Sequence, residues 1–513
     1  MIEDLGDEVG EVLDFDLEEF ESRVWEDTEF IKHELSKGSF DNPQAITGLE
    51  YEFYAVTDRD LGNLPDSYLA RVPRPLLRLI GFEKELGLHN AEMSTSPQPV
   101  NEYGLAAQEN EVKSRLKVAL ETAEVENLRL VSDGMWTVPP AGENSRDYLT
   151  NSVRRNGMYF SPNISPSTRY HVMSNGVRRS GNTIRLDAPN VSLDSETIAP
   201  ASLTTSIQPH YQVPEALDLP EYFSYAIRIA GPLLALGVNS PFFPPDLYDD
   251  VDPLRIIEEG WADHRIRVFE SVMNVGSKKV TFPQEYRTTE EAVDSIAEDD
   301  VYVPIKLERG NSFSDNFAYF NLKRGTYWRW VRPVFEGNTE TDAHLRIEFR
   351  PISGQPTVRD TIGFQALYVG LLTALPRHEH PVLNLDWETA RDNFYRAAKN
   401  GLDARIEWIN SDGERTTDMK DMYDEIFEFG LHGLEYHGFD GGTAYDYLWP
   451  LKKRFEEDIT PASWKRRRVL QRLSGESDFR NAVESMQREY IRKQDETLLD
   501  GTFVDWIRAS TAL

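Results

Sequence analysis

The chain has 513 residues, and its 87 Asp and Glu outnumber its 55 Lys and Arg, which gives a formal net charge of −32 at pH 7. This charge argues against binding to nucleic acids and anionic membranes, because both need positive patches on the protein. The absence of cysteine excludes disulfides, thiolate metal sites and a cysteine nucleophile.

The acidic surface also predicts adaptation to high salt. Like charges repel one another in dilute buffer but are screened at about 1 M salt, where the Debye length is about 3 Å. We therefore expect a halophilic protein; an ordinary acidic protein is the alternative. The sequence has no basic segment typical of a signal peptide and no apolar run that could span a bilayer. We expect a soluble, cytoplasmic protein.

Residues 1–44 are predicted to form an acidic, helical N-terminal extension. The spacing of apolar residues predicts a helix over Asp16–Lys37, ended by Gly38. The elements expected next are strands at Ile46–Val56 and near Asn90–Thr95, and an amphipathic helix at Asn101–Glu126.

Residues 133–200 are rich in Ser, Asn, Pro and Gly, and we expect mainly loops there. A strand at Leu203–Val213 and a buried helix at Leu219–Val238 follow. Residues of about 245–320 are expected to be an acidic insertion. The remaining predicted elements are strands at Tyr327–Val334 and Leu345–Ile352, and helices at Pro356–Leu375 and Trp387–Lys399.

No internal repeat or low-complexity linker divides the chain. We therefore predict one large α+β core over residues 45–440 and a helical C-terminal region over 441–513. The segment Lys452–Arg472 concentrates positive charge, unlike the rest of the chain.

Four of the predicted strands alternate polar and apolar residues, as expected of strands with one buried face. Their polar sides carry Glu50 with Glu52, Glu92, Gln208 with His210, and Arg346 with Glu348 and Arg350. If these strands share a sheet, one face carries a cluster of carboxylates with guanidinium groups beside it. The carboxylates would repel one another, so such a cluster is unstable without divalent cations. Carboxylate oxygens suit Mg²⁺ and Mn²⁺, and arginine suits phosphate. The pattern therefore predicts a metal–nucleotide site.

Each of these signals also has a structural interpretation. Glu50 and Glu52 could be solvated surface residues, His210 a structural histidine, and the Arg346–Glu348–Arg350 series a salt-bridge ladder. The apolar opposite face of the last strand favours a core sheet, in which uncompensated charge is costly. Sequence motifs of P-loop, dinucleotide-binding and HExxH sites are absent. We expect His378-Glu379-His380 to be a solvated turn.

An ordered series of segments resembles the glutamate–cysteine ligase and carboxylate–amine ligase superfamily, whose fold is related to that of glutamine synthetase. The segments of this chain that carry the resemblance are Gly48–Phe53, Glu85–Glu92, Arg169–Met173, Gln208–Glu215, Leu234–Phe242, Tyr327–Pro333, Ile347–Pro356 and Asp392–Ala404. Two positions depart from the family pattern: Gln208 replaces a histidine and Ser353 replaces an acidic residue.

The resemblance implies a curved antiparallel sheet that forms a funnel-shaped active site with helices outside. It also implies three groups of site residues. The metal ligands would be Glu50, Glu52, Glu85, Glu92, His210 and Glu348. The catalytic residues would be Arg332, Arg350 and Glu348, with the arginines contacting phosphate. The substrate-binding residues would be Asn239, Arg396 and Gln208.

The implied reaction uses ATP, with Mg²⁺ or Mn²⁺, to phosphorylate the γ-carboxylate of glutamate. An amine, expected to be that of cysteine, then attacks the acyl phosphate, as a step in thiol biosynthesis. Two alternatives stay open: a ligase of the same chemistry with another amine or carboxylate, and a non-catalytic nucleotide-binding relative. The oligomeric state, monomer or homo-oligomer, is also open.

Overall fold

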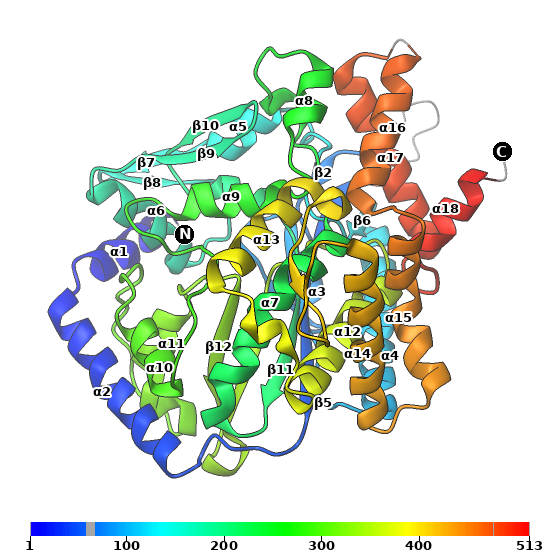
Figure 1. Cartoon of the computed structure of the whole chain (residues 1–513). Helices are drawn as coiled ribbons and strands as arrows, with labels where there is room; N and C mark the ends of the chain where they lie inside the picture. The colour runs from blue at the N-terminus through cyan, green and yellow to red at the C-terminus, as the bar shows by residue number, and fades with distance from the viewer. Residues whose placement is uncertain (1, 58–66, 476, 512–513) are drawn as a thin grey trace.

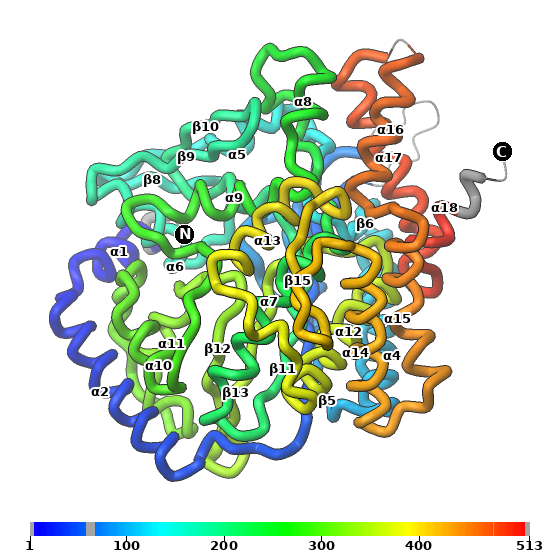
Figure 2. The backbone as a smooth tube through the Cα atoms, in the orientation of Figure 1, coloured from blue at the N-terminus to red at the C-terminus, as the bar shows by residue number. Residues whose placement is uncertain are grey.

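The computed structural model describes residues 2–57, 67–475 and 477–511. An antiparallel sheet curls through the molecule, with helices packed outside it (Figures 1 and 2). Its main strand order is β12-β13-β11-β1-β4-β3, and β2, β5 and β6 also pair with β1. The strands are β1 (Ile46–Thr57), β2 (Leu69–Ala70), β3 (Phe82–Lys84), β4 (Asn90–Ser94), β5 (Gln98–Pro99), β6 (Leu128–Val131), β11 (Ile207–Val213), β12 (Val331–Glu336) and β13 (His344–Phe349).

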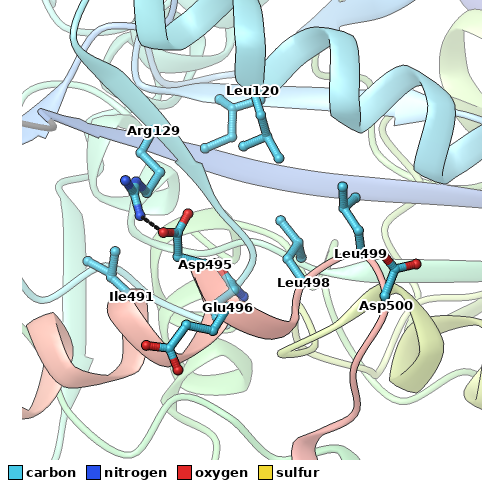
Figure 3. A pocket seen from close by; sticks show the side chains of 10 residues that line it. Leu120, Arg129, Ile491, Asp495, Glu496, Leu498, Leu499 and Asp500 are labelled. Atoms are coloured by element: carbon cyan, nitrogen blue, oxygen red, sulfur yellow. Dashed lines mark ion pairs between the residues drawn. The ribbon is translucent and has the colours of Figure 1, made fainter.

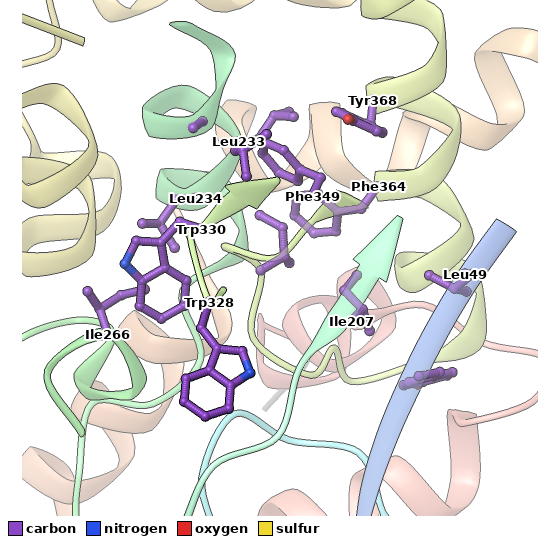
Figure 4. Close-up of a cluster of buried hydrophobic side chains, with 14 of the residues drawn as sticks. Leu49, Ile207, Leu233, Leu234, Ile266, Trp328, Trp330, Phe349, Phe364 and Tyr368 are labelled. Atoms are coloured by element: carbon purple, nitrogen blue, oxygen red, sulfur yellow. The ribbon is translucent and has the colours of Figure 1, made fainter. Parts of the chain in front are cut away.

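The apolar side of this sheet packs against α7 (Leu219–Gly237) and α12 (Val358–Arg377). Leu49, Ile207 and Phe349, from three adjacent strands, are buried in the same cluster as residues of these helices (Figure 4). The rings of Phe349 and Tyr368 lie 4.7 Å apart. Each such side chain contributes about 1.5–3 kcal/mol when fully buried, so this layer fixes which face of each strand turns away from the helices.

Helices α12 and α14 (Met419–Tyr436) approach closely because glycines face one another. A Cβ atom on Gly433 would lie 1.8 Å from the carbonyl oxygen of Gly370, and one on Gly370 would lie 2.2 Å from that of Gly430. The other helices after the sheet are α13 (Trp387–Asn400), α15 (Gly441–Glu456), α16 (Pro461–Ser474), α17 (Phe479–Thr497) and α18 (Phe503–Thr511); α4 (Glu102–Val125) precedes β6.

The N-terminal extension forms α1 (Ile2–Leu13) and α2 (Leu17–Ser36), as its helical pattern predicts. α2 packs on α10 (Thr289–Ala297) and α11 (Ala318–Arg324). Its buried Asp27 accepts hydrogen bonds from the backbone N–H groups of Tyr319 (2.8 Å) and Phe320 (3.1 Å), and Arg309 lies 2.6 Å away. One carboxylate thus satisfies two free N–H groups of the first turn of α11.

The structure departs from the expectations at residues 133–200 and at the start of one strand. Residues 133–200 contain more regular structure than the loops expected: α5 (Ser145–Thr150), α6 (Thr168–Arg179) and the hairpins β7 (Val153–Arg155) with β8 (Met158–Phe160) and β9 (Ile184–Ala188) with β10 (Val191–Ser195). Residues 245–320 hold α8 (Pro253–Glu259), α9 (His264–Met273) and α10. Strand β12 begins at Val331, not at Tyr327. α6 was missed because its polar sequence hides the helical period.

Two charges of the basic segment Lys452–Arg472, those of Arg454 and Lys465, are paired inside the protein. Lys465 of α16 forms a buried ion pair with Asp133 and donates to the carbonyl oxygen of Asn239 (2.8 Å). Gln487 also donates to Asp133 (2.8 Å). Arg454 pairs with Asp360 at 2.9 Å, again fully buried. These two residues are therefore structural in character. None of the helices in the described part of the chain is long and apolar enough to cross a membrane.

We predict that Lys465→Met destabilises the protein by about 3–5 kcal/mol, because it leaves Asp133 buried without its cation. The free energy of unfolding, measured by urea denaturation in concentrated salt, would show this loss. Lys420→Met is the matched control, since Lys420 pairs with Asp424 on the surface and its loss should change little. Equal effects of the two substitutions would contradict the structural role of Lys465.

Candidate active site

The register of the sheet brings the predicted polar side chains onto one face. Glu52 lies opposite Glu92 across β1 and β4. Glu348 of β13 lies opposite both His210 of β11 and Arg332 of β12. Gln208 lies opposite Glu50. Because residues two apart on a strand share a face, the four alternating strands form one continuous polar surface, as the sequence predicts.

This surface forms the wall of a cavity of about 400 Å³. Its acidic lining residues are Glu50, Glu52, Glu83, Glu85, Glu92, Glu336 and Glu348, and its arginines are Arg169, Arg265, Arg324, Arg332, Arg346 and Arg350. Glutamates of β1, β3 and β4 gather at one end, and the arginines of β12 and β13 at the other. The anionic end and the cationic end are named for the groups that predominate there. Arg169 and Arg265 also lie near Glu85 and Glu52, and Glu336 and Glu348 lie among the arginines.

Carboxylates at the anionic end repel one another. Burial, and then the charge of Glu348, raises the pKa of Glu50 to about 7. Burial and Glu52 raise the pKa of Glu85 to the same value, about 7. The pKa of Glu92 lies well above its ordinary value, through burial and then through Glu50 and Glu85. Carboxylates this close together are stable only when protons or cations reduce their repulsion. Their oxygen atoms suit Mg²⁺ or Mn²⁺ as ligands.

The pKa of Glu348 is shifted in the opposite direction, below its ordinary value. Burial alone would raise the pKa of its carboxyl group, but the guanidinium groups of Arg332 and Arg350 hold that pKa well below its ordinary value. Arg332 Nη2 lies 3.0 Å from Glu348 Oε1, and Arg350 Nη1 donates to the same oxygen. Arg350 also donates to Gln208 Oε1 (2.6 Å), whose amide donates to Glu52 Oε1 (2.9 Å). Gln208 therefore connects the two ends.

His210 lies at the boundary between them. Its Nε2 is 3.5 Å from Glu50 Oε1, and its Nδ1 accepts a hydrogen bond from Arg346 Nε at 2.9 Å. Burial, and then Arg346, lowers the pKa of the imidazole to about 3, so the ring is neutral. Glu50, His210 and Glu348 each offer one atom within 4.8 Å of the others, a spacing compatible with a cation.

Three residues named by the resemblance do not line this cavity. His210 lines the adjoining second cavity instead. The other two are Asn239 and Arg396. Asn239 is fully buried behind the first cavity and donates to the carbonyl oxygen of Gly354 (2.7 Å) and to Tyr490 Oη (3.0 Å). The side chain of Arg396 is 41% exposed and lies 3.6 Å from Glu407. Neither lines the cavity, and their assignment to substrate stays a prediction.

The expectation of a solvated turn at His378-Glu379-His380 was wrong for its last residue. His380 is buried, its Nδ1 accepts from the N–H of Val382 (3.1 Å), and its Nε2 lies 3.4 Å from Glu425 Oε2. It joins the turn to α14 and has no place in the cavity.

Several lining residues were missed from the sequence. Arg265, Phe269 and Met273 come from α9, inside the region expected to be an insertion, and Arg324 ends α11. No motif or period marks them. Arg169 could have been found, because it opens one of the segments that carry the resemblance.

A second cavity, of about 490 Å³, lies on the other side of Glu50 and shares Glu50, Glu336 and Arg346 with the first. Its lining includes the apolar Ile46 and Pro97. A smaller cavity of about 180 Å³, lined by residues of α4, β6 and α17 and their flanking segments, holds the ion pair of Arg129 and Asp495 at 2.6 Å (Figure 3). It shares no residue with the other two.

Comparison with known proteins gives a family and a fold. The model of glutamate-cysteine ligase family 2 matches residues 46–497. A search of curated proteins found no match. The chain is similar to the crystal structure of a glutamate–cysteine ligase from Francisella tularensis in complex with AMP, with a TM-score of 0.52 and 12% identity over 90% of this chain and 91% of that one. This likeness confirms the predicted fold.

A bifunctional glutathione synthetase from Pasteurella multocida is also similar, with a TM-score of 0.48 and 12% identity. The match covers 91% of this chain and 55% of that one.

Glu50 should make the stability of the cation-free protein depend on pH. Folding raises its pKa from 4.5 to about 7, so between these values the folded state holds a proton that the unfolded state has lost. Stability therefore falls as pH rises through this window. We predict that Glu50→Gln stabilises the protein at pH 8 and has little effect at pH 4.5, measured by thermal unfolding in EDTA and concentrated salt.

Glu414→Gln, at an exposed position, is the control and should show no such dependence on pH. A stability gain by Glu50→Gln that is equal at the two pH values would show that the carboxyl group does not titrate in this window.

Proposed function

Since the chain belongs to glutamate-cysteine ligase family 2, and is thus a ligase of the carboxylate–amine type, we propose that it joins glutamate to cysteine at the expense of ATP. The observation that carries this proposal is the cavity lined by glutamates of β1, β3 and β4 toward one edge of the sheet and by arginines of β12 and β13 toward the other. The uncompensated carboxylates suit the cations that accompany ATP, and the arginines suit a phosphoryl group in transfer.

In the proposed reaction, an oxygen of the γ-carboxylate of glutamate attacks the γ-phosphorus of ATP, and ADP leaves. The amine nitrogen of cysteine then attacks the carbonyl carbon of the acyl phosphate; phosphate leaves with the acyl–oxygen bond electrons, and the nitrogen loses a proton. Arg332 and Arg350 neutralise the phosphoryl oxygens, because both already converge on one carboxylate oxygen of Glu348. Positioned charges of this kind stabilise a transition state without reorganising.

The predicted ligands Glu50, Glu52, Glu85, Glu92, His210 and Glu348 would hold Mg²⁺ or Mn²⁺, and three of them, Glu50, His210 and Glu348, have the spacing of a metal site. When bound, the cation would neutralise charge on the triphosphate. The pKa values of Glu50, Glu85 and Glu92, raised above their ordinary range, support this assignment, because a cation relieves the repulsion that raises them. The reaction needs no nucleophilic side chain, in agreement with a chain that lacks cysteine.

The two adjoining cavities suit a reaction with three substrates. We assign the nucleotide base to the second cavity, because its lining includes the apolar Ile46 and Pro97 and it meets the first cavity at Glu50 and Arg346. Glutamate and the amine then share the first cavity, where Phe269 and Met273 supply apolar surface. A triphosphate that passes Glu50 would reach the arginines of β12 and β13.

The protein should release ADP from ATP and glutamate only when an amine acceptor is present. We expect cysteine to give the fastest release in a panel of amines, assayed with Mg²⁺ in concentrated salt. Faster release with another amine would assign a different product to the same chemistry. ATP binding without turnover on any amine would instead support a non-catalytic relative and reject the proposed ligase.

Glu348→Ala and Arg350→Ala should each lower kcat by about 10²-fold or more, as when other transition-state charges are removed. Arg255→Ala is the control, because Arg255 pairs with Glu259 on the surface of α8. Circular dichroism would verify folding of all three variants. Turnover close to normal in both cavity variants would show that these residues do not act on the phosphoryl group.

A further inference from the structure

Arg265 lies at the point where strand β13 leaves the sheet. The strand ends at Phe349, so the carbonyl groups of the next two residues lie beyond its last pairing with the neighbouring strands. Arg265 Nη2 donates to the carbonyl oxygen of Arg350 (2.7 Å), and Arg265 Nη1 donates to that of Pro351 (3.1 Å). Because a buried carbonyl group without a donor is costly, this guanidinium group takes the place of the missing sheet partners.

These contacts fix the backbone that carries the Arg350 side chain. The N–H of Arg350 donates to the carbonyl oxygen of Trp330 (2.9 Å), and its own carbonyl oxygen is held by Arg265. The Arg265 guanidinium also lies over the Trp330 ring, with its Cζ atom 5.1 Å from the ring centroid. The backbone of Arg350 is therefore anchored on both sides, which limits where its side chain can enter the cavity.

The carboxylate of Asp263 holds Arg265 in this place. Asp263 is fully buried and immediately precedes α9, the helix that carries Arg265. Its Oδ1 accepts a hydrogen bond from Ser240 Oγ (2.7 Å), and the Ser240 oxygen accepts one from the backbone N–H of Arg265 (3.1 Å). Burial lowers the pKa of Arg265 to about 10, and the charge of Asp263 opposes this change. Asp263 therefore acts on both the backbone and the charge of Arg265.

The other oxygen of Asp263 binds the segment that follows Arg350. Oδ2 accepts a hydrogen bond from Ser353 Oγ at 2.7 Å. Ser353 is one of the two positions that depart from the family pattern, in which an acidic residue stands there. The structure places a carboxylate beside this position all the same, because residue 263 supplies it and residue 353 supplies the hydroxyl. A Cβ atom on Gly134 would lie 2.7 Å from Ser353 Oγ, so the surroundings leave little room for a second carboxylate.

Arg265 uses its guanidinium group differently from Arg332 and Arg350. Those two side chains contact a carboxylate of the cavity wall, whereas both terminal nitrogens of Arg265 donate to carbonyl oxygens of the backbone. Only 5% of Arg265 is exposed. Its donors are therefore already used within the protein, and little of the group is left to contact a substrate.

We propose that Arg265 is a positioning residue for Arg350, and that Asp263, together with Ser353, holds Arg265 in place. The inference rests on the proposed function and refines it, since Arg265 would act on phosphoryl transfer only through Arg350. It also gives a function to part of residues 245–320, the region expected to be an insertion.

A double-mutant cycle on turnover tests whether Arg265 acts through Arg350. Arg265→Met should lower kcat by about tenfold or more, with a smaller change in the KM of glutamate, because Arg350 loses its fixed position. In Arg350→Ala protein the same substitution should lower kcat by about twofold or less, since the group that Arg265 positions is absent. Equal losses in the two backgrounds would refute the inference.

Arg267→Met is the matched control for this cycle. Arg267 lies on the same helix and contacts Asp187 on the surface at 3.5 Å, so its loss should change neither kcat nor KM. Arg265→Lys keeps the charge and can donate to one of the two carbonyl groups, and we expect it to have an intermediate kcat. It also replaces Arg265→Met in each measurement if thermal unfolding shows that the Met variant does not fold.

The position of Arg350 can be observed without turnover. Crystal structures of the wild-type protein and of Arg265→Met would be compared, and we expect the Arg350 side chain to leave Glu348 and Gln208 in the variant. An unchanged Arg350 side chain would overturn the inference even in an active ligase. A displaced side chain in a protein without ligase activity would instead reject the proposed function alone.

An exchange of residues 263 and 353 gives an independent test. Asp263→Ser removes the buried carboxylate, and Ser353→Asp adds a second one beside it, so each should lower the Tm measured in concentrated salt. The double variant again holds one carboxylate and one hydroxyl, and we expect its Tm to return most of the way to that of the wild-type protein. A Tm at or below the value given by adding the two single losses would refute the pairing of Asp263 with Ser353.

Discussion

The confinement of like charges on one face of a curled sheet is the constraint on which the site depends. Glu50, Glu52 and Glu92 occupy adjacent strands because the register of β1 and β4 sets them side by side. Their mutual repulsion is tolerable only if each carboxylate gains a proton, a cation or a guanidinium partner. At the arginine end that partner is part of the protein, and at the glutamate end it must come from solution.

The opposite face of the sheet makes this confinement possible. Leu49, Ile207 and Phe349 alternate with the charged residues and are buried against α7 and α12. A shift of one residue in register would move the charges into that apolar layer and the apolar residues into the cavity. The hydrophobic layer therefore determines the position of the charges, and the functional groups contribute little to the choice of fold.

The alternating strands were predictable because both the period and the chemistry of Glu50, Glu92, His210 and Glu348 are local in the sequence. Their meeting on one sheet was predictable only on the assumption that the strands pair. Arg265 and Arg324 were not predictable, because the sequence around each of them shows no regular alternation of polar and apolar residues that would mark the side chain as facing a cavity.

The contact between α2 and α11 links the extension at the N-terminus to the cavity. Asp27 holds the first turn of α11, and Arg324, the last residue of that short helix, lines the cavity and lies 3.3 Å from Glu336. Glu336 in turn holds Arg346. The first 44 residues thus stabilise the positions of Arg324 and Arg346 in the cavity. A shortened chain that begins at residue 45 would keep every catalytic side chain but would lose the contacts that hold these two arginines in place.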